Sequence, residues 1–174
     1  CNNESSFYYN EKVYRSIISG LDYIKGVQHE NGLFDYITCN FHSAPDTAFC
    51  IEKLISVLEY LNKKENPTLE ENSIREKVES IVKAGAYGLL EGGFHTPNHR
   101  WAIASILVKG SQLFGDKGLK EAAFQYLNEG IDSSEEGEYA EKSSGNYNRV
   151  NNDAMITLSD VLGDDQYDQY ALAN

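Results

Sequence analysis

The sequence predicts an all-α protein, and three observations support this fold class. Apolar residues recur at helical spacing, no segment has the alternation of a long β-strand, and only three prolines interrupt the 174 residues. The chain is 41% hydrophobic and 24% charged, which is typical of a globular domain with one core. We divide it into an N-terminal tail, residues 1–10, and a helical domain, residues 11–174.

Six apolar stripes predict six helices in chain order. The stripes are Val13, Ile17, Leu21 and Ile24; Leu54, Leu58 and Leu61; Ile74, Val78, Ile81, Val82 and Leu89; Trp101, Ala104, Ile106, Leu107, Leu113 and Phe114; Leu119, Ala122, Ala123, Tyr126, Leu127 and Ile131; and Ala154, Met155, Leu158, Val161 and Leu162. A short seventh helix is expected after Asp164, and "GEYAEKS" is expected to form a local extended loop.

The predicted helices alternate in character along the chain. Those that begin near Glu11, Ser73 and Lys117 carry charges on one face, as surface helices do. Those that begin near Pro45, Pro97 and Asn151 are apolar more nearly all round, which is typical of buried helices. We therefore expect outer and inner helices in turn, with the third helix ending at Gly92-Gly93 and the fifth at Gly130.

A repeat of 53 residues relates the loops that precede the inner helices. "FHSAPDTAF" begins at Phe41 and "FHTPNHRWA" at Phe94, and a further 53 residues separate Asn98 from Asn151. Such a period predicts a repeated helix hairpin. The loops Asn40–Asp46, Phe94–His99 and Tyr139–Asn151 are then expected at one common end. Helix N-termini gathered there favour anionic or hydroxyl-rich ligands.

The first dense group of polar side chains lies at the predicted start of the fourth helix. Pro97 and Asn98 have an ordinary structural explanation as a helix start and an N-cap. His99 and Arg100 do not, because basic side chains in a first turn oppose the helix dipole. We therefore expect a functional role for at least one residue of "NHR". His42 and His95 repeat one another, and packing or capping is as good an explanation for them as ligand binding.

The second dense group is "SSGNYNRVNND", from Ser143 to Asp153. A glycine turn capped by asparagine explains part of it. Tyr147 and Arg149, together with Asn148, are instead expected to face Asn98 across the same end of the helices.

A metal site and a pair of catalytic carboxylates are two other kinds of site that the residue types allow. His42, His95, His99 and Asp46 are acceptable metal ligands, but Pro97 separates the second and third histidines, so we predict neither a metal nor a cofactor. Asp46 and Asp153 form a possible carboxylate pair for a glycoside hydrolase, although either can equally be an N-cap.

The net charge and the lengths of the apolar segments limit the classes of partner that we expect. The net charge is −12 with no basic stripe, so we do not expect a nucleic-acid ligand, and no apolar run is long enough to cross a membrane. Cys1, Cys39 and Cys50 lack the spacing of a disulfide framework or a zinc ribbon. "CNNESS" is compatible with the start of a mature lipoprotein or with an arbitrary boundary, which weakly favours a periplasmic or cell-surface location.

"PNHRW" at the start of an inner helix, followed about fifty residues later by "NYN", resembles the (α/α) toroid polysaccharide lyases. These include the alginate, chondroitin AC and heparinase II/III-like groups, and the likeness covers roughly residues 90 to 162. The resemblance implies that Asn98 neutralises a substrate carboxylate and that His99 and Tyr147 are catalytic. Two departures are that only Arg100 separates the histidine from the tryptophan, and that Lys142 stands where those enzymes place an arginine.

The chemistry of β-elimination suits these residue types. The C5 proton of a uronic acid becomes acidic when donors such as Asn98, His99 or Arg100 neutralise its carboxylate. His99 and Tyr147 are then candidates for the base that removes the proton and the acid that protonates the leaving oxygen. The expected substrate is an acidic polysaccharide or oligosaccharide. The substrate-binding candidates are Arg100, His95, Trp101, Tyr139, Arg149, Asn148 and His42, of which Trp101 and Tyr139 are expected to stack on sugar rings.

Chain length limits the architecture. A closed toroid needs more hairpins than this chain contains, so we expect an incomplete (α/α) toroid of about three antiparallel hairpins. Its apolar edge is expected to meet further hairpins or to self-associate. Arg100 is expected to point into the cleft and to pair with Glu138, Glu141, Asp153 or a ligand carboxylate. The alternatives are a glycoside hydrolase on the same scaffold and a non-catalytic carbohydrate-binding or scaffold protein.

Overall fold

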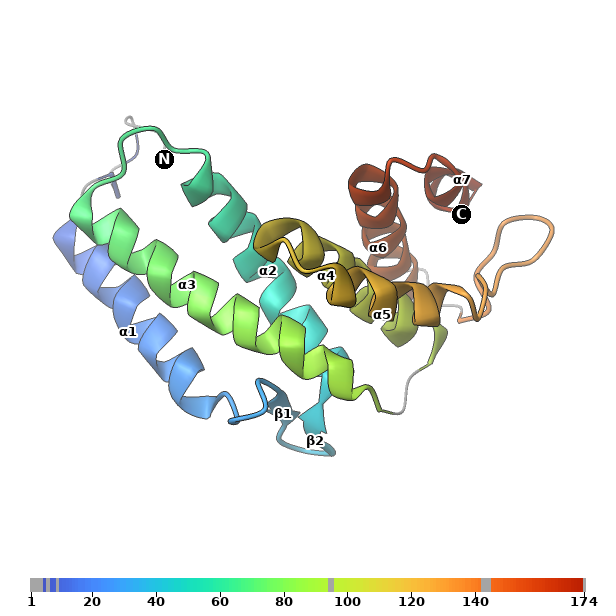
Figure 1. The fold of residues 1–174 in the computed structure, drawn as a ribbon, viewed down its shortest axis with the longest axis horizontal. Helices are drawn as coiled ribbons and strands as arrows, with labels where there is room; N and C mark the ends of the chain where they lie inside the picture. Colours follow the sequence, from blue (N-terminus) through green and yellow to red (C-terminus); the bar gives the residue numbers. More distant parts are fainter. Residues whose placement is uncertain (1–4, 6, 9, 94–95, 142–144, 174) are drawn as a thin grey trace.

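The all-α class is confirmed by a computed structural model that describes residues 5, 7–8, 10–93, 96–141 and 145–173 (Figure 1). The described elements, in chain order, are α1 Glu11–Val27, β1 Phe34–Tyr36, β2 Asn40–Ser43, α2 Ala44–Asn62, α3 Leu69–Gly88, the 3-10 turn η1 Leu89–Glu91, α4 Pro97–Phe114, α5 Lys117–Leu127, α6 Tyr147–Leu162 and α7 Gln166–Ala173. None of the helices within the described residues is both long enough and apolar enough to span a membrane, as the sequence predicted.

The helices form two rows. In the inner row α4 packs between α2 and α6, and in the outer row α3 covers α2, α5 covers α4 and α7 covers α6. Helix α1 lies beside α3 at the outer edge (Figure 1). This is the alternation of outer and inner helices that the apolar patterns predicted. Helix α4 is the most enclosed element, and Trp101, Ala104 and Leu107 have no exposed surface.

Local capping explains where several helices begin. Ser43 accepts the Asp46 N–H at the start of α2, and Thr68 and Glu71 form a capping box at the start of α3. Glu71 is buried, and Lys64 neutralises it at 2.5 Å. The apolar stripe alone suggested a start near Ser73. Because of this capping box, α3 begins at Leu69 instead.

The last inner helix begins earlier than predicted. Helix α6 starts at Tyr147, since the Val150 N–H already donates to the Asn146 carbonyl, and Asn151 lies one turn inside it. Asp153 is therefore a helix-interior residue, and the suggestion that it is an N-cap is wrong. The same suggestion for Asn98 is also wrong, because Thr96 occupies the N-cap position of α4.

A short β-hairpin before α2 was not predicted. Strands β1 and β2 pair antiparallel, with Phe34 opposite Ser43 and Tyr36 opposite Asn40, and the register shifts between the two pairs. Strands of three and four residues are too short to show an alternating pattern. The expected extension within 137–143 takes the form of an isolated antiparallel bridge between Ser133 and Tyr139.

The loop before the hairpin is in direct backbone contact with the end of α3. A Cβ atom on Gly32, at φ +86°, would lie 2.0 Å from the Ala84 carbonyl oxygen, and one on Gly88 would lie 2.6 Å from that of Asn31. The Gln28 side chain strengthens this contact by donating to the carbonyl oxygens of Gly32 and Ile81, at 2.9 and 3.0 Å. The start of the hairpin is thus held firmly against α3.

This close approach makes Gly88 sensitive to substitution. We expect Gly88→Ala to lower the free energy of unfolding by about 1–3 kcal/mol, because the new methyl group meets backbone atoms that cannot move aside cheaply. Gly20→Ala in α1 is the matched control, since nothing lies within 4 Å of the added carbon. This control substitution is expected to raise the free energy of unfolding by up to about 1 kcal/mol, because alanine has a higher helix propensity than glycine. Urea denaturation measures both, and equal effects would contradict the close-contact explanation.

Candidate functional site

The three inner helices run in parallel, which brings their N-terminal halves together. One cavity is lined by residues from the second and third turns of α2 and α4 and from the start of α6, while a second depression is lined by residues from the C-terminal ends of the three helices. Asn98, His99 and Tyr147 lie nearer the helix starts and are not part of this lining. At the first end the Phe49 ring of α2 meets the His99 ring of α4 edge-on, with 5.9 Å between centroids. The described parts of the three polar loops therefore share one end, as the 53-residue repeat predicted.

The cavity at this end has a volume of about 320 Å³. Its apolar lining includes Ala48 from α2 and Ala102 and Ile106 from α4. Its charged lining is made of Glu52, Lys53, Arg149 and Asp153. Two acids and two bases balance one another here, so the cavity is locally neutral in a chain whose net charge is −12.

The helix N-termini at this end differ in how their N–H groups are satisfied. At α2, Ser43 is the N-cap and donates its hydroxyl to Asp46 at 2.5 Å. At α4, the carboxylate of Glu141 accepts the Asn98 N–H at 2.8 Å and takes the place of a local cap. No side chain of the described residues caps α6, whose first turn contains no acid. The start of α6 is therefore the N-terminus best suited to an external anion.

The Asn98-His99 pair lies at the start of α4. Asn98 is buried, and its side-chain oxygen accepts the Thr96 hydroxyl at 2.5 Å. This contact fixes the amide and leaves its nitrogen as the donor. His99 is half-buried beside Phe49.

Arg100 is buried, but its predicted partners were wrong. Its guanidinium contacts Glu129 at 3.1 Å, Asp132 at 2.5 Å and the Gly130 carbonyl oxygen at 2.9 Å. These groups belong to the segment after α5, which returns across the start of α4. Arg100 does not line the cavity, so the expectation that it points into the cleft is also wrong. The positive charge of Arg100 is thus neutralised within the protein by Glu129 and Asp132.

Trp101 and Tyr139 were expected to stack on sugar rings, and the structure corrects this. They are 0% and 1% exposed, and they pack against each other with 5.3 Å between ring centroids. The Tyr139 hydroxyl donates to Asn152 at 3.1 Å, and burial raises the pKa of Tyr139 to about 12. Both aromatic faces are used by the core, so neither is available to a sugar.

The predicted residues of α6 are more accessible. Tyr147, the first residue of the helix, is 43% exposed, and Arg149 lines the cavity with its Nε atom 3.7 Å from Asp153. Asn148 is half-buried between them in the chain. His95 and Lys142 lie outside the described residues.

Residues that sequence reasoning did not select also belong to this end. Phe49 and Glu141 contact the Asn98-His99 pair, although Phe49 was only the end of the repeated segment "FHSAPDTAF" and Glu141 was expected to pair with Arg100. Asn151 is fully buried, and neither its side-chain oxygen nor its nitrogen has a hydrogen-bond partner in the part of the chain that is described. The 53-residue spacing from Asn98 was the one signal that pointed to Asn151.

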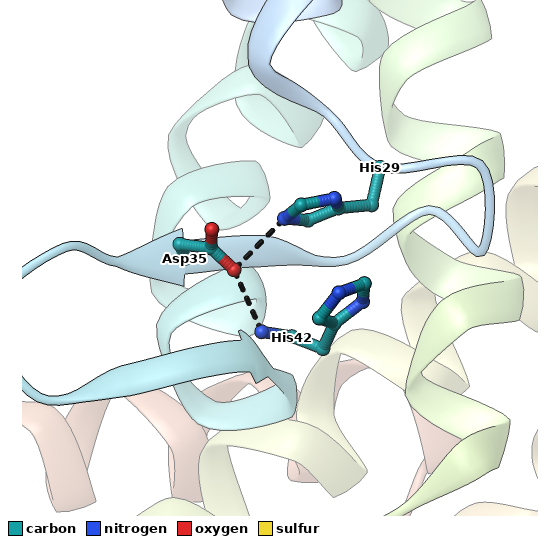
Figure 2. Close-up of side chains that lie close together, drawn as sticks. All are labelled: His29, Asp35 and His42. Atoms are coloured by element: carbon teal, nitrogen blue, oxygen red, sulfur yellow. Dashed lines mark hydrogen bonds and ion pairs between the residues drawn. The ribbon is translucent and has the colours of Figure 1, made fainter.

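Of the candidate metal ligands from the sequence, His42, Asp46 and His99 are described, and these three do not converge on one point. Among the described residues, the group of three potential ligands that converges is His29, Asp35 and His42, on the hairpin side of α3 (Figure 2). His42 thus meets a histidine that the sequence analysis did not single out, and it does not line the cavity.

No protein-family model, curated protein or solved structure matches this chain. The described structure shows two rows of helices, with a cavity between the N-terminal halves of the inner helices.

The buried position of Arg100 gives a testable difference between two arginines. We expect Arg100→Ala to lower the free energy of unfolding by about 1–3 kcal/mol, because it removes charge-assisted hydrogen bonds and leaves the Gly130 carbonyl oxygen without its donor. The half-exposed acids regain water, which keeps the loss below that of a fully buried pair. Arg149→Ala is expected to change it by less than about 0.5 kcal/mol, since that side chain is solvated. Thermal and urea unfolding compare the two, and equal losses would contradict this assignment.

Proposed function

We propose that this chain is part of an incomplete (α/α) toroid that binds acidic polysaccharide at the common end of α2, α4 and α6. The observation that carries the proposal is the start of α6, where a helix N-terminus without a side-chain cap from the described residues opens beside Arg149 and Asn146 on the cavity wall. Peptide N–H groups, a helix dipole and a guanidinium together suit the carboxylate of a uronic acid.

The reaction we propose at this end is lyase-like β-elimination. The Asn98 amide nitrogen and Arg149 are the donors for the uronate carboxylate, because Arg100 already has internal partners. His99 and Tyr147 stand at the starts of adjacent inner helices, and one is the base for the C5 proton while the other protonates the leaving oxygen. The exposed Tyr147 hydroxyl is free to approach a ligand from solvent.

The alternatives receive different support from the geometry. A glycoside hydrolase would need Asp46 and Asp153 to face one bond, but the Asp46 carboxylate already accepts the Ser43 hydroxyl at the start of α2. A non-catalytic binding protein needs only the cavity and its donors, so it remains the second candidate. Ile156 and Leu172 are exposed apolar side chains at the C-terminal edge, where we propose that further hairpins or a second copy pack.

The catalytic proposal rests on a single hydroxyl group. We expect Tyr147→Phe to abolish formation of unsaturated product from oligouronates while leaving ligand binding and the melting temperature nearly unchanged. His99→Ala should do the same, and the double variant should lose little more, as groups that act as a unit do. Ultraviolet absorbance of the unsaturated ends measures turnover, on the chain expressed with any flanking sequence that its gene encodes.

Tyr23→Phe is the control for this experiment, because Tyr23 is an exposed tyrosine on α1, away from the cavity. Full turnover in Tyr147→Phe would contradict the lyase assignment. New reducing ends without unsaturated product would favour the hydrolase, and binding without turnover would favour the non-catalytic protein.

The binding proposal predicts a charge-specific loss of affinity. Arg149→Ala should weaken binding of an oligouronate at least tenfold, about 1.4 kcal/mol, and leave binding of a neutral oligosaccharide of the same length unchanged. Arg15→Ala on α1 is the control, since it is a solvated arginine in an i,i+4 pair outside the cavity. Calorimetry at two salt concentrations measures the affinities, and equal losses for Arg149→Ala and Arg15→Ala would contradict a specific carboxylate contact.

A further inference from the structure

The hairpin before α2 brings together three side chains that the cavity does not use. His29 follows α1, Asp35 lies on β1 and His42 on β2, and one ligand atom from each lies within 4.8 Å of the others. Figure 2 shows the two imidazole rings one above the other with the Asp35 carboxylate at their edge. Two histidines and a carboxylate are the donor set of three-ligand zinc sites, which keep a fourth position for water.

From this geometry we propose that His29, Asp35 and His42 bind one divalent zinc ion. The site is separate from the polysaccharide-binding end and does not depend on that proposal. Zinc would join the loop after α1 to both strands of the hairpin, and so hold the segment that leads into α2.

The backbone of His42 supports a role for its side chain. His42 has φ +48°, and it is the sole non-glycine residue of the described chain with a positive φ. The register shift between β1 and β2 places this residue at a bulge opposite Asp35, where proteins ordinarily use glycine. A histidine kept in a conformation that favours glycine is a reason to look for a function of the imidazole.

The Asp35 carboxylate is oriented as a ligand. Its Oδ1 atom accepts the His42 backbone N–H at 2.7 Å and lies 2.8 Å from His29 Nε2. The hydrogen bond from His42 lowers the pKa of Asp35, and His29 lowers it further, so the carboxylate is anionic at neutral pH. The buried His29 Nε2 has no directed hydrogen bond within the described residues despite this short distance. The two atoms are close enough to share one proton or one cation.

A second set of contacts orients the His42 ring. Asn31 Oδ1 lies 3.4 Å from His42 Nδ1, and the Asn31 amide nitrogen donates to Glu91 at 2.9 Å. A hydrogen bond from Nδ1 to Asn31 selects the tautomer in which Nε2 is free to bind a metal, as partners of this kind do around zinc. The loop that carries His29 and Asn31 is held against α3 by the close contacts of Gly32 and Gly88.

Zinc binding requires a defined local movement. The two rings stack with 3.9 Å between centroids and 23° between their planes, so their lone pairs do not yet point at one ion. Tetrahedral ligands at Zn–N distances near 2.0 Å lie about 3.3 Å from one another, so the three ligand atoms have to rearrange, and His29 Nε2 and Asp35 Oδ1, which are 2.8 Å apart, have to separate slightly. His42 is exposed and can swing its ring, while His29 and Asp35 are already close together.

The decisive variant is His42→Gly, because it separates the fold from the ligand. Glycine suits the positive φ, so the metal-free variant should melt at the same temperature as the parent chain or higher. It should nevertheless lose at least tenfold in zinc affinity and most of the zinc-induced rise in melting temperature. Titration of the full chain with zinc chloride, by calorimetry and by thermal unfolding, measures both quantities. Magnesium chloride in parallel should produce neither effect.

Further variants define the ligand set. His29→Ala and Asp35→Asn should each lose zinc binding, whereas His99→Ala, at the other histidine of the described chain, should retain it. Cys39→Ser should also retain it; loss there would indicate a thiolate site and overturn the proposed ligands. Zinc binding by His42→Gly at the affinity of the parent chain, or no one-to-one binding by the parent chain, would overturn the proposal. Saturation at one ion per chain with loss in all three ligand variants supports it.

Discussion

Helix α4 lies between α2 and α6 with α5 across it, and its side chains from Arg100 to Val108 are all buried. A guanidinium in that environment has to contact anions. The free-energy cost of burying an unpaired charge is a large fraction of the total stability of a small domain. Glu129 and Asp132 supply the anions, and the Gly130 carbonyl oxygen completes the set. The segment after α5 is thereby tied to the start of α4.

Enclosure of α4 also divides the polar group at its start into two kinds of residue. Arg100 and Trp101 face the interior and serve the fold, whereas His99, one position earlier, is half-buried beside Phe49. Successive residues of a helix point about 100° apart, so neighbours in the sequence meet different surroundings. The motif "NHRW" therefore does not present one continuous polar surface, because Arg100 and Trp101 are buried while His99 is half-buried.

In the hairpin, too, the local backbone conformation decides which surroundings a side chain meets. Its bulge places His42 opposite Asp35, and the backbone contacts of the preceding loop with α3 place His29 beside both. Three residues spaced six and seven positions apart in the chain become one group because an irregular strand pairing aims them at the same point. Regular pairing over so few residues would turn His42 to the other face.

The sequence by itself determined the helical class, the alternation of outer and inner helices and the common end of the repeated loops, because apolar periodicity records which faces are buried. It also identified Asn98 and His99 as polar residues at a helix start, and Tyr147 and Arg149 as polar residues that precede the last inner helix. It misplaced the start of α6, missed the hairpin and misjudged Trp101 and Tyr139. Those features depend on contacts that apolar periodicity does not record, such as the packing of Trp101 against Tyr139 and the irregular pairing of β1 with β2. A residue type states what a side chain is able to do; only the tertiary packing decides whether it faces the core, a neighbour or a ligand.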